Sequence, residues 1–197
     1  MRIGILGAGG MADALGTRWV AAGHEVFAGG RDATRAAAEY GEDVVLVALP
    51  WRAAVDVVAG LREVLRGRVL IDCTNPVGPG FVLETVNGPS VSARLASAAP
   101  DAQVVKGLNL CHEDVWRMAP PVFDGRPLAV PLCGDDAGAL SVVRRLVRDL
   151  GCEPLDAGGL ARAGLLEATA ALLIGLWVGE GADAQAIAPP YAAAGRR

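Results

Sequence analysis

Short apolar runs alternate with stretches of helical periodicity along most of the chain. Residues 2–6 are mostly apolar and are followed by a glycine-rich stretch, which is typical of a buried parallel strand. Similar runs recur at residues 24–28, 43–49, 68–72 and 102–106, and apolar positions at helical spacing occupy residues 11–22, 53–65 and 91–98. Strands that alternate with helices predict βαβ units, and therefore an α/β, Rossmann-type doubly wound parallel sheet.

The pattern starts again after about residue 120. Residues 127–133 and 153–156 predict two further strands with an amphipathic helix at residues 135–150, and a long apolar helix follows over residues 160–178. We therefore expect a nucleotide-binding domain over residues 1–120 and a small C-terminal α/β extension over residues 121–197. Because the last helix is apolar around much of its circumference, it is either buried in the core or buried against a second subunit, and we expect at least one of its faces to form a homodimer contact.

Composition narrows the choice of partners and compartment. The chain has 197 residues, of which 52% are hydrophobic and 20% are charged, and its formal net charge is −4. This charge gives no reason to expect a nucleic acid or an anionic membrane as partner. We expect the partner to be a small-molecule substrate or a second redox cofactor. The apolar segment at residues 165–178 contains Glu167 and is shorter than the roughly 18 apolar residues that a spanning helix needs.

The cysteines and histidines give no sign of a metal site. The four cysteines form no CxxC pair, and only two histidines are present. Free thiols are typical of a reducing cytoplasm, where we expect the protein to act. The cysteines are Cys73, Cys111, Cys133 and Cys152.

A glycine turn follows the first predicted strand. Gly7, Gly9 and Ala12 form the pattern G-x-G-x-x-A, with Gly10 and Met11 inside it. In a strand–turn–helix setting this pattern is typical of dinucleotide binding: the first glycine allows the tight turn, and the second lets the backbone approach a pyrophosphate. The helix that begins there offers unpaired N–H groups and the positive end of its dipole to the phosphates.

The end of the second predicted strand indicates which nucleotide is bound. An NAD site would place Asp or Glu about 20 residues after the glycine turn, to bind the ribose 2′-hydroxyl. Gly30 occupies that position here, and Arg31 follows it. Arg31 offers a fork of donors that matches a 2′-phosphate, and Arg35 is placed to add a second contact or to stack on the adenine. The sequence therefore predicts NADP(H) as cofactor.

Turn-forming and polar residues follow the next three strands, where ligands bind in open α/β sheets. We expect Leu49 and Pro50 to line the nicotinamide-side ribose, Trp51 to form an apolar wall, and Asn75 and Asn109 to bind ribose or carboxamide.

The candidates for acid–base chemistry are His112, Lys106 and Glu113, of which His112 is the first choice. Neither a Ser-x-x-x-Lys nor a Tyr-x-x-x-Lys arrangement stands out in the sequence. Carbonyl reduction needs a proton donor at the developing alkoxide, whereas hydride transfer between two rings needs mainly their juxtaposition.

These motifs together resemble the NADPH:deazaflavin (coenzyme F420) oxidoreductase family. The resemblance also extends to related predicted dinucleotide-binding reductases and to the reductase domain of membrane metalloreductases. It rests on residues 7–12, 30–31, 49–51, 75–77, 106–109, 130–136 and 154–160. It implies that Gly7, Gly9, Met11, Gly30, Arg31 and Pro50 hold NADP(H). It also implies a partner pocket that is completed by the C-terminal part and formed by Trp51, Asn109, Leu132, Cys133 and Gly134.

Three functions follow from these observations. The first is an NADP(H)-dependent oxidoreductase that transfers hydride to a second acceptor, with coenzyme F420 as the leading candidate. The second is an NADPH-dependent reductase of a small carbonyl or imine, with His112 or Lys106 as proton donor. The third is a non-catalytic NADP(H)-binding sensor whose last helix contacts a partner protein.

Overall fold

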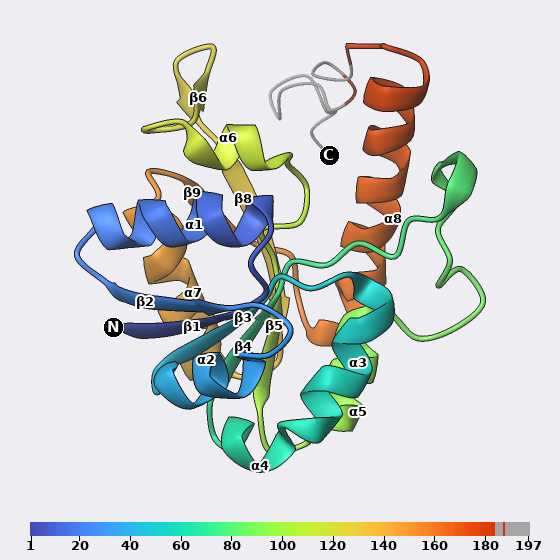
Figure 1. Cartoon of the computed structure of the whole chain (residues 1–197). Coiled ribbons are helices and arrows are strands. Elements are labelled where there is room, and N and C mark those ends of the chain that lie inside the picture. The colour runs from blue at the N-terminus through green and yellow to red at the C-terminus, as the bar shows by residue number, and fades with distance from the viewer. Residues whose placement is uncertain (184–186, 188–197) are drawn as a thin grey trace.

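The computed structural model describes residues 1–183 and 187, and its centre is a seven-stranded sheet (Figure 1). The strand order is β2-β1-β3-β4-β5-β8-β9. The first five strands in this order are parallel, as predicted for a Rossmann-type fold. They are β1 (Arg2–Leu6), β2 (Glu25–Gly29), β3 (Val44–Val47), β4 (Val69–Asp72) and β5 (Gln103–Lys106). Because β2 and β3 lie on opposite sides of β1, the chain reverses its direction of winding beside β1.

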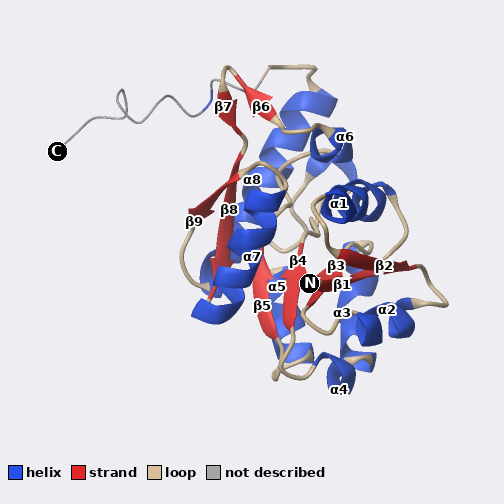
Figure 2. Cartoon of the chain, turned by 90° about the vertical axis from the view of Figure 1, so that its left-hand side faces the viewer, coloured by secondary structure: helices blue, strands red, loops and turns tan. Residues whose placement is uncertain are grey.

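The C-terminal part of the chain continues the same sheet. Strand β8 (Ala129–Gly134) pairs antiparallel with β5, and β9 (Glu153–Asp156) pairs parallel with β8. Figure 2 shows β9 at one end of the sheet and β2 at the other. Strands β6 (Val122–Phe123) and β7 (Arg126–Pro127) form a separate small hairpin. The predicted domain boundary at residue 120 therefore divides a chain that shares one sheet, and it stays a prediction.

Helices cover both faces of the sheet, because strand side chains alternate between the two faces. In β3, Val44 and Leu46 face one apolar cluster, whereas Val45 and Val47 face the other. The first cluster includes side chains of α1 (Gly10–Ala21), α6 (Glu113–Arg117) and α7 (Ala137–Asp149). The second includes side chains of α2 (Thr34–Tyr40), α3 (Trp51–Gly60), α4 (Arg62–Leu65) and α5 (Val91–Ala98). The short helices α2 and α6 were not predicted from the sequence.

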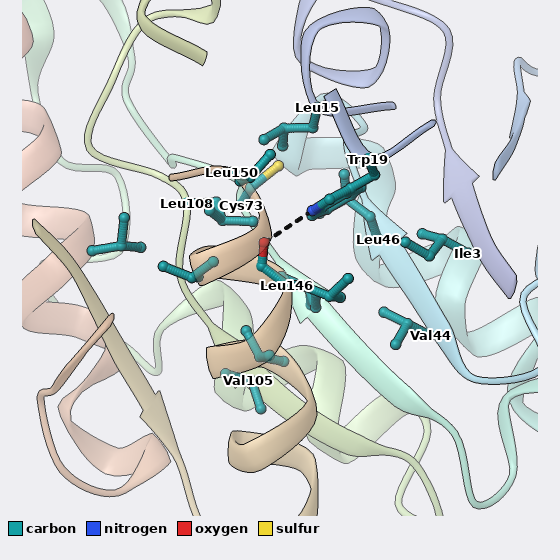
Figure 3. Close-up of a cluster of buried hydrophobic side chains, with 14 of the residues drawn as sticks. Ile3, Leu15, Trp19, Val44, Leu46, Cys73, Val105, Leu108, Leu146 and Leu150 are labelled. Carbon is teal, nitrogen blue, oxygen red and sulfur yellow. Dashed lines mark hydrogen bonds between the residues drawn. The ribbon is translucent and has the colours of Figure 1, made fainter. Parts of the chain in front are cut away.

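The first cluster joins the N-terminal and C-terminal halves of the chain. Trp19 of α1 is fully buried, and its indole Nε1 donates a hydrogen bond of 3.2 Å to the carbonyl oxygen of Leu146 in α7 (Figure 3). The buried indole thus satisfies its donor while its ring packs in the core. This contact joins α1, at whose start the glycine turn lies, to α7 on the same face of the sheet.

The last helix stands beside the sheet (Figure 1). It consists of a 3₁₀ turn η2 (Leu160–Arg162), α8 (Ala163–Ile174) and a π-helical turn η3 (Gly175–Gly179). The segment Leu160–Gly179 has 20 residues and a mean hydropathy of 1.5, so by length and composition it could cross a membrane, and 28% of it is buried. The sequence-based expectation concerned only residues 165–178 of this segment, and the expectation that the protein has no membrane partner stays a prediction.

Candidate functional site

The glycine turn joins β1 to α1 with a geometry that only glycine allows at its first position. Gly7 has φ = 129°, and a Cβ there would collide with the carbonyl oxygen of Ala48. The N–H of Gly7 donates to the carbonyl oxygen of Gly29 over 2.8 Å, which joins the ends of β1 and β2. Gly9 caps α1, and no atom lies within 4 Å of the place that a Cβ on Gly9 would take. The backbone at Gly9 is therefore open to an incoming group.

Gly10 has a different neighbour. A Cβ on Gly10 would collide with Oε1 of Glu113, which comes from α6. The space that the missing side chain leaves at Gly10 is thus taken by a carboxylate of the protein. Sequence reasoning assigned Gly10 to the cofactor alone and missed this packing role.

The residues predicted to select the nucleotide lie in a turn after β2. The N–H of Ala33 donates to the carbonyl oxygen of Gly30 over 2.9 Å and closes this turn. Arg31 is exposed and has no hydrogen bond or ion pair with any described residue. Arg35 is also exposed, but its Nε lies 2.9 Å from Oε1 of Glu39 on the same helix. Of the two arginines, Arg31 therefore has the guanidinium that is available to an anion.

A pocket of about 550 Å³ lies at the carboxyl ends of β4 and β5. Figure 1 shows α8 on one side of this region and the start of α1 with α6 on the other. The pocket is lined by Met11, Cys73, Asn75, Asn109, Leu110, Cys111, His112, Glu113, Val115, Ile174, Trp177 and Val178. Its position beside the first turn of α1 is where the fold class places the reacting end of a dinucleotide. The resemblance implied that the C-terminal part completes the pocket, but it did not point to the last helix, which contributes Ile174, Trp177 and Val178.

Two predicted asparagines meet in this pocket. The side-chain amide of Asn75 donates to the backbone oxygen of Asn109 over 2.7 Å. Nδ2 of Asn109 in turn donates to Oδ1 of Asn75 over 2.9 Å and to the carbonyl oxygen of Leu166 over 3.2 Å. The pair therefore connects the ends of β4 and β5 to α8. Oδ1 of Asn109 is buried and has no hydrogen-bond partner among the described residues.

The prediction that residues of β8 form part of the partner pocket is wrong. Leu132 and Cys133 are fully buried, and a Cβ on Gly134 would press against Val105 and Leu140. The reason is that β8 lies inside the sheet, between β5 and β9, so its side chains face the helix layers.

The residues after β3 also lie outside the pocket lining. Leu49 and Trp51 are partly buried and pack against the second apolar cluster. The guanidinium of Arg52 stacks on the indole of Trp51 at 4.6 Å from the ring centroid. Pro50 is exposed and precedes the first turn of α3.

The acid–base candidates have contrasting environments. The side chain of His112 is 67% exposed and lines the pocket, and its Nδ1 accepts a hydrogen bond of 3.3 Å from the N–H of Asp114. Lys106 is fully buried and is not among the pocket-lining residues. The structure thus contradicts the hypothesis that Lys106 donates a proton to a substrate.

Lys106 instead belongs to a buried ionic network. Its Nζ lies 3.1 Å from Oδ2 of Asp72 and 3.7 Å from Oε1 of Glu167, and it donates to the carbonyl oxygen of Thr74. All three charged side chains have no exposed surface. Ser92 adds a hydrogen bond of 2.6 Å to Asp72. Two carboxylates therefore share one ammonium group in the interior.

Glu167 brings α8 into this network. Its Oε1 accepts a hydrogen bond of 2.7 Å from the N–H of Val91, and its Oε2 accepts one of 3.1 Å from the hydroxyl of Thr85. Burial raises the pKa of the Glu167 carboxyl, while the Lys106 ammonium opposes this shift. The segments that follow β4 and β5 form one side of the pocket, and the last helix forms another. The network therefore holds these two sides in place.

The cysteines near the pocket are inert thiols. Burial raises the pKa of Cys73 to about 12 and that of Cys111 to about 11. Both residues line the pocket, and a thiol with such a pKa is a poor nucleophile at neutral pH. All four cysteines are free, and no group of three or more metal-ligating side chains occurs in the described part of the chain.

The comparisons with known proteins relate the chain to nucleotide-dependent reductases. Residues 2–76 match the family model for NADP oxidoreductase, coenzyme F420-dependent. Metalloreductase STEAP3 of Rattus norvegicus is 30% identical over 190 residues, which is 89% of this chain and 38% of the relative. The F420-dependent NADP reductase of Methanocaldococcus jannaschii is 29% identical over 142 residues, which is 68% of this chain and 61% of the relative. The chain thus spans less than two thirds of these curated relatives.

Solved structures agree with this relationship. A crystal structure from Arthrobacter sp. FB24, provisionally assigned as an F420-dependent NADP reductase, has a TM-score of 0.82 and 25% identity. The match covers 92% of this chain and 95% of that protein. An imine reductase from Aspergillus terreus shares the fold, with a TM-score of 0.64 and 20% identity over 90% of this chain and 63% of that protein. The resemblance drawn from the sequence motifs is therefore confirmed: residues 2–76 match the family model of the coenzyme F420-dependent NADP oxidoreductases, and the chain is similar in sequence and fold to proteins that carry this name.

Proposed function

We propose that this chain is an NADP(H)-dependent oxidoreductase that transfers a hydride between NADP(H) and a second ring, with the deazaflavin of coenzyme F420 as acceptor. The observation that carries the proposal is the 550 Å³ pocket beside the first turn of α1. A glycine turn alone supports nucleotide binding, whereas a pocket next to it also provides room for a reaction partner.

The described residues fit NADP(H). Gly9 leaves an open approach to the start of α1 for a pyrophosphate, and Arg31 has free donors for a 2′-phosphate. With the pyrophosphate at Gly9 and the adenosine end toward Arg31, the nicotinamide end extends toward β4 and β5. This direction leads into the pocket that Met11 and Asn75 line.

In this reaction the residues of the chain hold the two rings in position and exclude water from the pocket. The bound nicotinamide supplies the hydride. Met11, Ile174 and Trp177 provide apolar walls from opposite sides of the pocket, which favour the close approach of two flat rings. The buried network at Glu167 keeps the α8 wall at a fixed distance from the strand ends.

We expect the protein to exchange hydride between NADPH and purified deazaflavin coenzyme. The measurement follows the absorbance of both rings after mixing, in each direction, with protein-free mixtures as the control. Equal and opposite changes in the two reduced cofactors would support the proposal. Binding of both compounds without any exchange would refute it.

A second candidate function is reduction of a small imine or carbonyl. The observation that favours it is the position of His112, an imidazole that lines the pocket. Under this hypothesis His112 donates the proton that such a reduction needs, so His112→Ala abolishes turnover of an imine substrate. The same variant retains ring-to-ring hydride transfer, which distinguishes the two candidates. The third hypothesis, a non-catalytic sensor, predicts that NADP(H) binds and that no hydride is exchanged with any acceptor.

We also propose that the protein acts as a homodimer in the cytoplasm. Leu165 and Leu172 of α8 are each 56% exposed, and covering such apolar surface would be favourable. The four free cysteines agree with a reducing compartment.

A further inference from the structure

Glu113 is the one carboxylate among the described residues that line the pocket, and no lysine or arginine shares this lining. Its side chain is 33% exposed. Neither the nucleotide preference nor the hydride transfer proposed above uses this residue. A carboxylate in a largely apolar pocket has a strong influence on any charge that develops there, because little water screens it.

Helix α6 places Glu113 at a defined position. Trp116 of α6 is buried in the first apolar cluster, and Arg117 lies 3.2 Å from Asp13 of α1. These contacts hold α6 against α1, so that Oε1 of Glu113 packs on Gly10 in the first turn of α1.

The charge of Glu113 is not neutralised by a neighbouring guanidinium. Arg117 is the cation of the same helix, and it pairs with Asp13 and Asp114. Among the described residues, the ion-pair neighbour of Glu113 is His112, whose Nε2 lies 3.4 Å from Oε2.

The nicotinamide end of the cofactor enters the same pocket. This statement rests on the proposed function, in which Gly9 holds the pyrophosphate and Arg31 the adenosine end. The ring then lies beyond Met11, and both Met11 and Glu113 line the pocket that receives it.

We propose that Glu113 stabilises the oxidised form of the bound nucleotide. The nicotinamide ring is a cation in NADP⁺ and is neutral in NADPH, whereas the phosphates of the two forms are the same. When a hydride leaves the neutral ring for the acceptor, the ring becomes positively charged, and the acceptor gains one hydrogen nucleus with two electrons. A second proton, taken up from water with release of hydroxide, keeps the charge of the acceptor unchanged. The Glu113 carboxylate lowers the energy of that positive charge and thereby favours hydride donation to the acceptor.

The test is the ratio of the dissociation constants for NADPH and NADP⁺. Repulsion between a carboxylate and the phosphates affects both constants equally and cancels in the ratio. We expect Glu113→Gln to reduce the preference for NADP⁺ over NADPH by about tenfold, which corresponds to about 1.4 kcal/mol. Calorimetric or fluorescence titration of the intact protein with each nucleotide provides the constants.

Asp114→Asn is the matched control, because it removes the same charge from the next residue. Asp114 is 76% exposed, bonds to Arg117 over 2.9 Å and does not line the pocket. We expect this variant to keep the wild-type ratio within about twofold. Glu113→Ala serves as a second variant, with the same expected direction as Glu113→Gln.

The outcomes separate this inference from the proposed function. If the wild-type protein binds both nucleotides and the ratio is the same in Glu113→Gln, Glu113→Ala and Asp114→Asn, the role of Glu113 is refuted while nucleotide binding stands. If the two Glu113 variants and the Asp114 variant shift the ratio equally, the effect is one of net charge, and the inference also fails. If the wild-type protein binds neither nucleotide, the proposed function itself is refuted, and the inference falls with it.

Discussion

Replacing Arg31 by alanine is expected to weaken NADPH binding by about 10- to 100-fold and to leave NADH binding within about twofold of the wild-type value. A charge-assisted hydrogen bond to a phosphate contributes roughly 1.5–3 kcal/mol, and NADH lacks the 2′-phosphate that would receive it. Arg31 is exposed and free of partners among the described residues, so its removal disturbs no internal contact. Titration of each variant with both coenzymes measures the effect.

Arg35→Ala is the matched control for this prediction. Arg35 lies one helical turn after Arg31 and is engaged with Glu39 at 2.9 Å. We expect Arg35→Ala to change NADPH affinity only slightly, because this ion pair competes for its guanidinium. Equal losses of NADPH and NADH affinity in Arg31→Ala would instead show that Arg31 does not contact the 2′-phosphate.

Lys106→Met is expected to lower the free energy of unfolding by about 3–5 kcal/mol, which is the typical cost of leaving buried charge without its counterion. Methionine has a similar length, so the variant leaves no large cavity. It does leave Asp72 and Glu167 side by side without the ammonium group that lies 3.1 Å from one and 3.7 Å from the other. Urea denaturation followed by circular dichroism gives the change.

The variant Glu167→Gln tests whether the loss of stability in Lys106→Met comes from unbalanced buried charge. This variant keeps a side-chain oxygen that can accept the N–H of Val91, and it leaves Lys106 paired with Asp72. We therefore expect a much smaller loss than for Lys106→Met, of about 1 kcal/mol or less. A loss as large as that of Lys106→Met would indicate that the network depends on the Glu167 charge itself.

The wild-type protein and the Glu167→Gln variant are expected to differ in how the free energy of unfolding depends on pH. Because the pKa of Glu167 is raised in the folded state, the folded protein holds this proton at pH values where the unfolded chain has released it. The contribution of Glu167 to stability is therefore present below the ordinary pKa of a glutamate and is lost as the pH rises through the raised value. Glu167→Gln is expected to lack this decline.

The C-terminal helix shows where sequence reasoning reached its limit. Its apolar character was evident from residues 160–178, and Glu167 was noted as a charge within it. A buried charge in an apolar helix requires a partner, so the position of Glu167 is a signal in the sequence for a partner group elsewhere in the fold. The sequence did not say that the partner is Lys106, which lies 61 positions earlier, or that Ile174 and Trp177 reach the pocket at the ends of β4 and β5.

The incorrect assignment of Leu132 and Cys133 to the partner pocket also results from a contact between distant parts of the chain. The resemblance placed a family motif near the second ligand, but a motif does not specify which way its side chains face. In the structure β8 pairs with strands on both sides, so Leu132 and Cys133 point into the helix layers and have no exposed surface. Pairing between β5 and β8 is a long-range contact, and the local sequence carries no information on it.

The amino-acid sequence was sufficient to predict the parallel strands and most of the helices, the glycine turn at Gly7 and Gly9, and Arg31 as the cation after β2. These features depend on local periodicity, backbone conformation and spacing within one βαβ unit, all of which neighbouring residues encode. Three features became visible only in the folded molecule: the last helix forms a wall of the pocket, Lys106 is buried between Asp72 and Glu167, and Glu113 packs on Gly10. Those contacts join residues far apart along the chain, and they form because apolar burial brings the elements together and leaves each buried charge to be satisfied by whichever group lies beside it.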